Sequence, residues 1–274
     1  MNNYLLSLKI KKKILRTAFE KRKGHLGGSL SVLDILISLF TCGHLKLNKK
    51  NFIKKNNDKL ILSKGHTAIA LYALMEQLNI SSYYKLEDFN SSNKSLLEHP
   101  TLTKNNSEIS CETGALGHGL PISSGLALAN SKKKVVCVIG DGELFEGSNW
   151  EALFFIAAKK LTNLLIIVDC NNFITLGKIS DILSQNDLKK KFQSFNFNVD
   201  EIDGHNFNKI GNSIKKFSKK KLSKPMVLLC KTIKGRGIVG MENTSAIHHG
   251  FPSQKQFEQT LNKIDKQIKS YEKV

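Results

Sequence analysis

The sequence is poor in proline and arginine and has no long hydrophobic run. No stretch of its 274 residues approaches the roughly 20 apolar residues that a membrane-spanning helix needs. Segment 1–24 intersperses charges among its apolar residues, and no small-residue cleavage site follows an uninterrupted apolar region, which argues against a signal peptide. We therefore expect a protein that neither spans a membrane nor is secreted.

The five cysteines show no paired spacing. Three of them (Cys137, Cys170 and Cys230) fall within apolar runs and are expected to act as buried small hydrophobes. The motifs CxxC, HExxH and GxxxxGK[ST] do not occur, which argues against a zinc site and against nucleotide hydrolysis. A reduced, cytoplasmic protein fits this pattern best.

The formal net charge of +19 comes almost entirely from lysine, because the only arginines are Arg16, Arg22 and Arg236. A basic protein can bind nucleic acid. Here, however, the lysine runs are spread along the chain and no aromatic side chains are interleaved with them as in RNA-binding modules. The composition, rich in lysine, asparagine, isoleucine and phenylalanine, is what an AT-rich coding sequence produces. We interpret the charge as solvated surface and expect no nucleic-acid partner.

Helical and strand-like patterns alternate along the chain. This alternation predicts an α/β fold with a mostly parallel sheet and helices on both of its faces. The polar segment 90–110 is expected to be a long loop, and the polar C-terminal helix an appendage to a single domain spanning 1–274. Helices are predicted over 4–21, 31–41, 66–78, 119–130, 147–160, 183–193, 206–220 and 254–271, and strands over 59–63, 135–139, 164–169, 197–202 and 226–233.

Polar residues follow two of the predicted strands. Asp141 stands after the run Val135–Ile139 within Gly-Asp-Gly, and Asn171 stands after Leu164–Val168. The carboxyl ends of parallel strands open into one crevice, so these two side chains are expected to meet there. Carboxylate and amide oxygens beside glycines suit Mg²⁺ bridged to a diphosphate.

This Gly-Asp-Gly and Asn-Asn pattern is similar to the signature of thiamine diphosphate enzymes, and further motifs resemble one family among them. KGHLGGSLSVLDIL, LSKGHTAIALYAL, EHPT, ETGALGHGLPISSGLALA and KTIKGRGIVGMEN with HHG look like transketolase, in transketolase order, from about Gly24 to Gly250. The resemblance implies the thiamin diphosphate-binding fold and the cofactor Mg²⁺–thiamine diphosphate, for which Ca²⁺ or Mn²⁺ can replace Mg²⁺.

The resemblance also assigns site residues. It implies metal binding by Asp141, Asn171 and the carbonyl of Phe173, and a sugar channel lined by His25, His99 and His249. Contacts to the cofactor are implied for His66, Gly114, Leu116, Gly142, Glu146, Asn171 and His249. His249 is preferred over His248 because it directly precedes glycine. His118 is a further candidate, and Glu146 and Glu151 are expected in a glutamate network across a subunit interface.

In transketolases, the glutamate that activates the cofactor and the arginines that bind substrate phosphate belong to later domains. The resemblance implies that the pyrimidine-binding and C-terminal domains are absent from 1–274. The chain is therefore expected to be the N-terminal subunit of a split transketolase, inactive without a C-terminal partner and assembled with it two plus two, or as a homodimer. The implied reaction moves a two-carbon ketol unit from xylulose 5-phosphate to ribose 5-phosphate or erythrose 4-phosphate, in the pentose phosphate pathway.

Some features leave alternatives open. Glu98 stands where the family usually has glycine before His-Pro, and Cys170 where an acid is common. GRGIVG at 235–240 has the letters of a dinucleotide motif, but MENTSAIHHGFP after it does not start a helix. The alternatives are a subunit of another thiamine diphosphate enzyme, such as a 1-deoxyxylulose 5-phosphate synthase or a 2-oxoacid dehydrogenase, and a non-catalytic degenerate scaffold.

Overall fold

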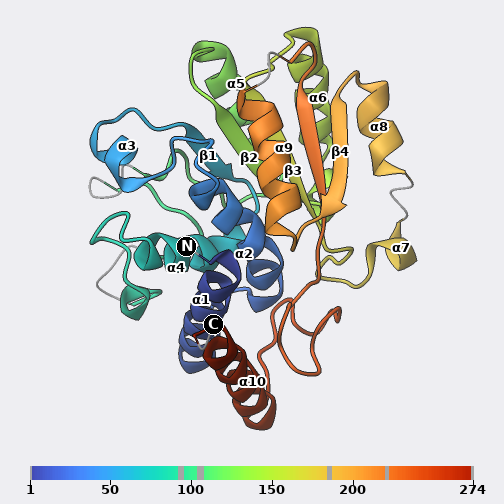
Figure 1. The fold of residues 1–274 in the computed structure, drawn as a ribbon. Coiled ribbons are helices and arrows are strands. Elements are labelled where there is room, and N and C mark those ends of the chain that lie inside the picture. The colour runs from blue at the N-terminus through green and yellow to red at the C-terminus, as the bar shows by residue number, and fades with distance from the viewer. Residues whose placement is uncertain (1, 92–95, 104–107, 184–186, 220–221, 273–274) are drawn as a thin grey trace.

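A five-stranded sheet forms the centre of the molecule in the computed structural model (Figure 1). The structure describes residues 2–91, 96–103, 108–183, 187–219 and 222–272. The strands follow the order β1-β2-β3-β5-β4, and each neighbouring pair is parallel. Their bounds are β1 Lys59–Leu62, β2 Val135–Gly140, β3 Leu164–Cys170, β4 Asn198–Asp203 and β5 Met226–Lys231.

Helices cover both faces of this sheet, as predicted. Alternate residues of β2 and β3 point to opposite faces and enter two separate apolar clusters. Helices α1, α2, α4 and α9 pack on the face that carries Val136 and Ile167, and α5, α6 and α8 on the face that carries Cys137 and Ile166. The helices are α1 Asn3–Lys21, α2 Leu26–Thr41, α3 Lys49–Ile53, α4 Ala68–Gln77, α5 Gly119–Ala129, α6 Gly147–Ala158, α7 Ile179–Ile182, α8 Leu188–Ser194, α9 Phe207–Lys219 and α10 Gln254–Glu272.

Helix α2 begins five residues earlier than the predicted start at residue 31. Its first turn contains Gly27 and Gly28, which at the level of sequence indicate a loop. A Cβ on Gly27 would lie 2.8 Å from the carbonyl oxygen of Ile247, and one on Gly28 would lie 2.9 Å from the Thr67 side chain. The glycines therefore serve close packing of the helix against two other segments, which local pattern does not reveal.

The helix predicted over 183–193 is also different. The chain forms α7 and then α8, and residues 184–186 between them lie outside the described part. Asp187 caps α8 by accepting a hydrogen bond from the backbone N–H of Lys190 at 3.1 Å. Parts of the predicted loop 90–110, at 92–95 and 104–107, likewise lie outside the described residues.

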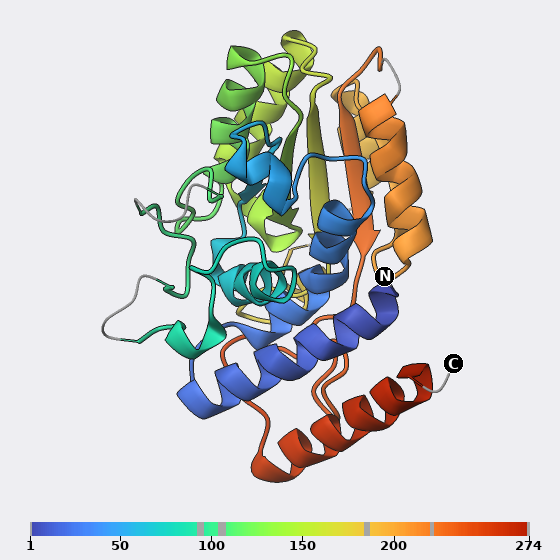
Figure 2. The same ribbon diagram turned by 60° about the vertical axis from the view of Figure 1, so that its left-hand side comes forward.

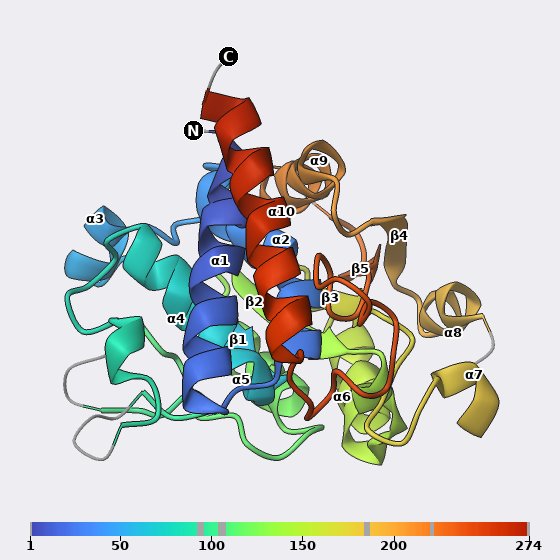
Figure 3. The ribbon, with the colours of Figure 1, turned by 90° about the horizontal axis from the view of Figure 1, so that it is seen from below.

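Helix α10 lies alongside α1 (Figures 2 and 3). The rings of Phe19 and Phe257 stack at 4.0 Å between centroids, and Ile264 is buried between the helices and the rest of the core. Of the described helices, none is both long and apolar enough to cross a membrane.

Candidate active site

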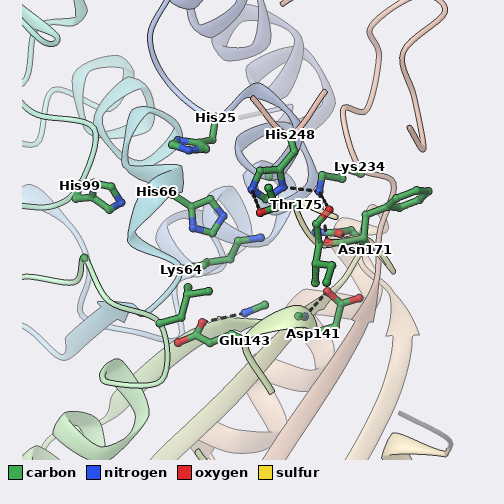
Figure 4. A pocket seen from close by; sticks show the side chains of 17 residues that line it. His25, Lys64, His66, His99, Asp141, Glu143, Asn171, Thr175, Lys234 and His248 are labelled. Carbon is green, nitrogen blue, oxygen red and sulfur yellow. Dashed lines mark hydrogen bonds between the residues drawn. The ribbon is translucent and has the colours of Figure 1, made fainter. Parts of the chain in front are cut away.

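The predicted meeting of the two strand ends is present. Gly140 of β2 is paired with Asp169 of β3, so Asp141 and Asn171 emerge from neighbouring strands at one edge of the sheet. Both line a cavity of about 250 Å³ at the carboxyl ends of the strands (Figure 4). This is the position at which parallel α/β sheets bind ligands.

Backbone hydrogen bonds orient the Asp141 and Asn171 side chains. The Asp141 carboxylate accepts from the N–H of Gly142 at 2.9 Å and of Asn172 at 2.5 Å. Burial, together with the nearby Asp169, raises the pKa of Asp141 to about 7. The amide oxygen of Asn171 accepts from the N–H of Phe173 at 3.1 Å. A buried carboxylate of this kind is favoured as an anion only when a cation lies beside it.

A buried ion pair lies next to this edge. The ammonium of Lys64 binds the carboxylate of Asp169, and their side chains are 2% and 0% exposed. Asp169 also accepts hydrogen bonds from the hydroxyls of Ser31 and Thr232. The amide nitrogen of Asn171 lies 3.3 Å from the Ser31 hydroxyl, so this network also sets the orientation of the Asn171 amide.

Lys234 is the second buried lysine of the cavity, and among the described residues no carboxylate lies within ion-pair distance of it. Its ammonium is 2.7 Å from Nδ1 of His248 and 3.4 Å from the carbonyls of Phe173 and Ile174. Burial and the charge of Lys64 lower the pKa of Lys234 to about 8. A buried cation with only neutral partners fits a site that receives an anion.

Histidines gather on the opposite side of the cavity from Asp141 and Asn171 (Figure 4). The ring of His25 lies 5.3 Å from that of His66, 6.4 Å from His99, 5.9 Å from His248 and 5.1 Å from His249, centroid to centroid. Burial lowers the pKa of His25, and it lowers the pKa of His66 well below its ordinary value. Burial and Lys234 lower the pKa of His248 to about 3. These imidazoles are neutral at physiological pH and can accept as well as donate protons.

Glu98 stands beside this cluster. Its carboxylate accepts from the N–H of Gly24 at 2.9 Å and lies 4.0 Å from Nδ1 of His25. Within the described part of the chain, Nδ1 of His25 is buried without a hydrogen-bond partner. Glu98 is thus the carboxylate that faces His25, and its negative charge partly offsets the effect of burial on the pKa of His25.

Glu143, inside the Gly-Asp-Gly turn, is fully engaged within the protein. Its carboxylate binds the hydroxyl of Ser63 and accepts from the N–H groups of Gly117 at 2.9 Å and Gly140 at 3.2 Å. Glu143 therefore ties the turn after β2 to the turn after β1 and to the segment that begins α5. Because Gly117 has a φ of +82° and its Cβ would lie 2.5 Å from the Ser148 hydroxyl, only glycine fits this contact.

Most of the residues assigned from sequence line the cavity, and some do not. Those that do are His25, His66, His99, Gly114, Leu116, Asp141, Gly142, Asn171 and Phe173. Glu146 and Glu151 are exposed at the start of α6, and His249 packs against His25 outside the lining. His248, which sequence reasoning set aside in favour of its neighbour, lines the cavity instead.

Sequence reasoning missed four charged residues of this region: Lys64, Glu143, Asp169 and Lys234. A signal was available for three of them. Asp169 stands at the end of an apolar strand, and Lys64 and Lys234 follow strands within the same motifs that supplied the histidines and glycines. A charged residue directly after a buried strand of a parallel sheet lies at the ligand edge.

The donor set fits a metal–diphosphate group. Asp141, Asn171 and the Phe173 carbonyl provide hard oxygen ligands at one side, and Lys64 and Lys234 provide positive charge beside them. Grouping of three or more His, Cys, Asp or Glu side chains suited to a metal does not occur among the described residues. The oxygens present would therefore hold a metal only together with oxygens of the bound group, as Mg²⁺ commonly does with phosphates.

Comparison with known proteins gives the same answer as the geometry. The family model described as "Transketolase, thiamine diphosphate binding domain" matches residues 13–266. The chain is 36% identical over 245 residues to an apulose-4-phosphate transketolase subunit of Actinobacillus succinogenes, covering 88% of this chain and 87% of that protein. It is 32% identical over 262 residues to human transketolase, covering 92% of this chain and 40% of that protein.

Solved structures show the same fold. The crystal structure of the Campylobacter jejuni transketolase superposes on the whole chain with a TM-score of 0.79 and 25% identity, and the match covers 48% of that protein. The chain thus spans about half the length of this enzyme. A strand-edge cavity with a Gly-Asp-Gly turn, buried lysines and clustered histidines, a family model matched over most of the sequence, and relatives above 30% identity establish together that this chain belongs to the transketolase family and carries its thiamine diphosphate-binding domain.

Proposed function

We propose that this chain is the cofactor-binding subunit of a split transketolase, which transfers a two-carbon ketol unit from a ketose phosphate to an aldose phosphate. The observation that carries the proposal is the cavity itself. It combines oxygen ligands for Mg²⁺ with two buried lysines and a cluster of neutral histidines within about 250 Å³. Each group corresponds to one requirement of the reaction.

Metal and diphosphate are held at the sheet edge in this proposal. Asp141, Asn171 and the carbonyl of Phe173 hold Mg²⁺. Lys234 provides the positive charge for the diphosphate, assisted by Lys64, whose own charge is partly balanced by Asp169. His66 and Gly142 complete the diphosphate contacts, and Gly114 and Leu116 lie along the cofactor's rings.

The histidines act on the sugar. Thiamine diphosphate, when bound, supplies a nucleophilic carbon that takes up the ketol unit. His25 and His99 are neutral groups at the cavity wall and exchange protons with substrate hydroxyls, and His248 or His249 does so from the HHG segment. Because His248 faces the cavity and is hydrogen-bonded to Lys234 and Thr175, we assign it a place beside the diphosphate.

A partner subunit completes the site in this proposal. Large apolar side chains are exposed on α5 and α6, next to Leu116 at the cavity wall: Ile122, Leu128, Phe154 and Phe155. An apolar surface of this kind marks an interaction site. Glu146 and Glu151 lie at the start of α6 on the same side and would join the interface network. The relatives from Actinobacillus succinogenes and Phocaeicola vulgatus are each named as one subunit of an apulose-4-phosphate transketolase, which supports a two-plus-two assembly.

The sugar phosphates remain to be identified. Xylulose 5-phosphate with ribose 5-phosphate or erythrose 4-phosphate, the substrates of a cytoplasmic pentose phosphate pathway enzyme, are our first choice. The relatives named for apulose-4-phosphate and for 6-deoxy-6-sulfo-D-fructose make those two ketoses the next donors to test.

The test is a ketol-transfer assay with Mg²⁺ and thiamine diphosphate, run on this chain alone and after mixing with the pyrimidine-domain subunit encoded in the same genome. Activity in the mixture only is the expected result. Activity of this chain alone would contradict the need for a partner. Cofactor binding without transfer of any donor would favour a different thiamine diphosphate enzyme, and absence of cofactor binding would favour a degenerate scaffold.

A further inference from the structure

A second buried ion pair lies behind the cavity, outside its lining. His205 follows β4, and Asp34 lies in the middle of α2. Nδ1 of His205 is 2.8 Å from a carboxylate oxygen of Asp34, and the two side chains are each 5% exposed. Asp34 also accepts a hydrogen bond from the hydroxyl of Ser7 at 2.5 Å, and Lys11 lies 3.9 Å away.

The other ring nitrogen of His205 has a partner that fixes the tautomer. The backbone N–H of Ile233 points at Nε2 of His205 at 2.9 Å. A backbone N–H can only donate, so Nε2 must carry a lone pair and the proton must reside on Nδ1, where it is donated to Asp34. Asp34 thus selects the form of His205 that accepts from Ile233.

Ile233 directly precedes Lys234, the buried cation of the cavity. On the other side, the hydroxyl of Thr232 binds Asp169, and the N–H of Thr232 donates to the carbonyl of Cys170 at 3.1 Å. Residues 232 and 233 are therefore held from two directions, by β3 and by His205. The close approach of the turn after β4 requires glycine, because a Cβ on Gly204 would lie 2.5 Å from the Thr232 side chain.

We propose that His205 is a positioning residue which, oriented by Asp34, holds the backbone at Ile233 and so places the ammonium of Lys234 where the cofactor's diphosphate binds. This inference rests on the proposed function only for the identity of the anion. Lys234 has no carboxylate partner among the described residues, so its position depends on its backbone more than that of Lys64, which Asp169 holds directly.

Two substitutions separate the two hydrogen bonds of His205. The amide of His205→Asn reaches the position of Nδ1 and can still bind Asp34, but it does not reach Ile233. The longer His205→Gln places an amide oxygen near the position of Nε2, where it can accept from Ile233. Matched controls are His44→Asn and His44→Gln, at a histidine that faces Lys215 and Lys219 of α9.

The measurement is the dissociation constant of thiamine diphosphate in the presence of Mg²⁺, by calorimetry, on variants whose circular dichroism matches the parent protein. His205→Asn is expected to weaken binding about tenfold or more. His205→Gln and both controls are expected to stay within about threefold, given the scatter of single-substitution effects. Equal loss in the Asn and Gln variants, or no loss in either, would overturn the positioning role.

A cofactor-free readout covers the case in which a variant does not fold or the protein binds no thiamine diphosphate. In the unsubstituted protein, ¹⁵N NMR of His205 is expected to show protonated Nδ1 and unprotonated Nε2, with slow amide exchange at Ile233. A protonated Nε2, or fast exchange at Ile233, would contradict the inference. Failure of thiamine diphosphate to bind, with both NMR results as expected, would count against the proposed function alone.

Discussion

Lys64 and Asp169 form an ion pair that is almost completely withdrawn from solvent, with side chains 2% and 0% exposed. Lys64 follows β1 and Asp169 lies in β3, so the pair bridges the two strands that flank β2 at the ligand edge of the sheet. Each member stands two residues before a proposed site residue, Lys64 before His66 and Asp169 before Asn171. The pair therefore joins the stability of the fold to the geometry of the site.

Removing one member of this pair is expected to be costly. Lys64→Met leaves a buried carboxylate without its cation and should lower the free energy of unfolding by about 3–5 kcal/mol. Asp169→Asn should act similarly, and the double variant should lose less than the sum of the two. Urea unfolding of the four proteins gives the coupling energy. Additive losses would show that the two charges do not stabilise each other.

Asp141 is expected to determine metal-dependent cofactor binding. Asp141→Ala removes a proposed Mg²⁺ ligand and should weaken Mg²⁺–thiamine diphosphate binding by more than about 100-fold, beyond the 10–100-fold typical of residues that only support a ligand. Calorimetry with and without Mg²⁺ measures this, and circular dichroism should show a retained fold. Asp181→Ala on the exposed surface of α7 is the matched control. Unchanged, metal-dependent affinity in Asp141→Ala would refute the site.

The histidine cluster predicts that stability falls in mild acid. His25, His66 and His248 all have pKa values below the ordinary 6.5, so the folded chain holds them neutral. The unfolded chain binds these protons once the pH falls below about 6.5, and the free energy of unfolding then decreases by up to about 1.4 kcal/mol per pH unit for each proton. The contribution is fully present above that pH and is lost as the pH falls toward the folded-state values.

Urea unfolding between pH 7.5 and 5 measures this slope. His66→Gln should reduce the slope by up to one proton, because it removes the ring whose pKa burial lowers most strongly among those that line the cavity. His44→Gln, at a histidine on the surface, is the control. A slope that is the same in both variants would mean that His66 is not held neutral by the fold.

Gly65 cannot carry a side chain. Its Cβ would lie 1.6 Å from the carbonyl oxygen of Thr113, so Gly65→Ala must displace backbone and is expected to lower the free energy of unfolding by more than about 4 kcal/mol. Gly211→Ala is the matched control, because a Cβ there meets nothing within 4 Å and lies in α9. That substitution should raise stability by about 0.5–1 kcal/mol. Chemical denaturation compares the two, and a tolerated Gly65→Ala would contradict the packing.

The alternation of helices and strands was sufficient to predict the sheet class, and Gly-Asp-Gly with Asn-Asn was sufficient to predict which strand ends meet. These are local features, because period-2 and period-3.6 patterns and residues after a strand depend on near neighbours in sequence. The start of α2 was not predictable, since Gly27 and Gly28 are selected by contacts with Ile247 and Thr67, which are distant in sequence.

Tertiary structure alone decided which histidine of the HHG pair faces the cavity. His248 is held there by Lys234 and Thr175, from β5's end and from the turn after β3, and no local rule relates these three segments. The Lys64–Asp169 pair and the His205–Asp34 pair likewise join residues 105 and 171 positions apart. The sequence by itself determined the fold and the sheet edge that binds ligands. The tertiary structure determined the charge balance of the site, because burial and pairing set the state of each ionisable group.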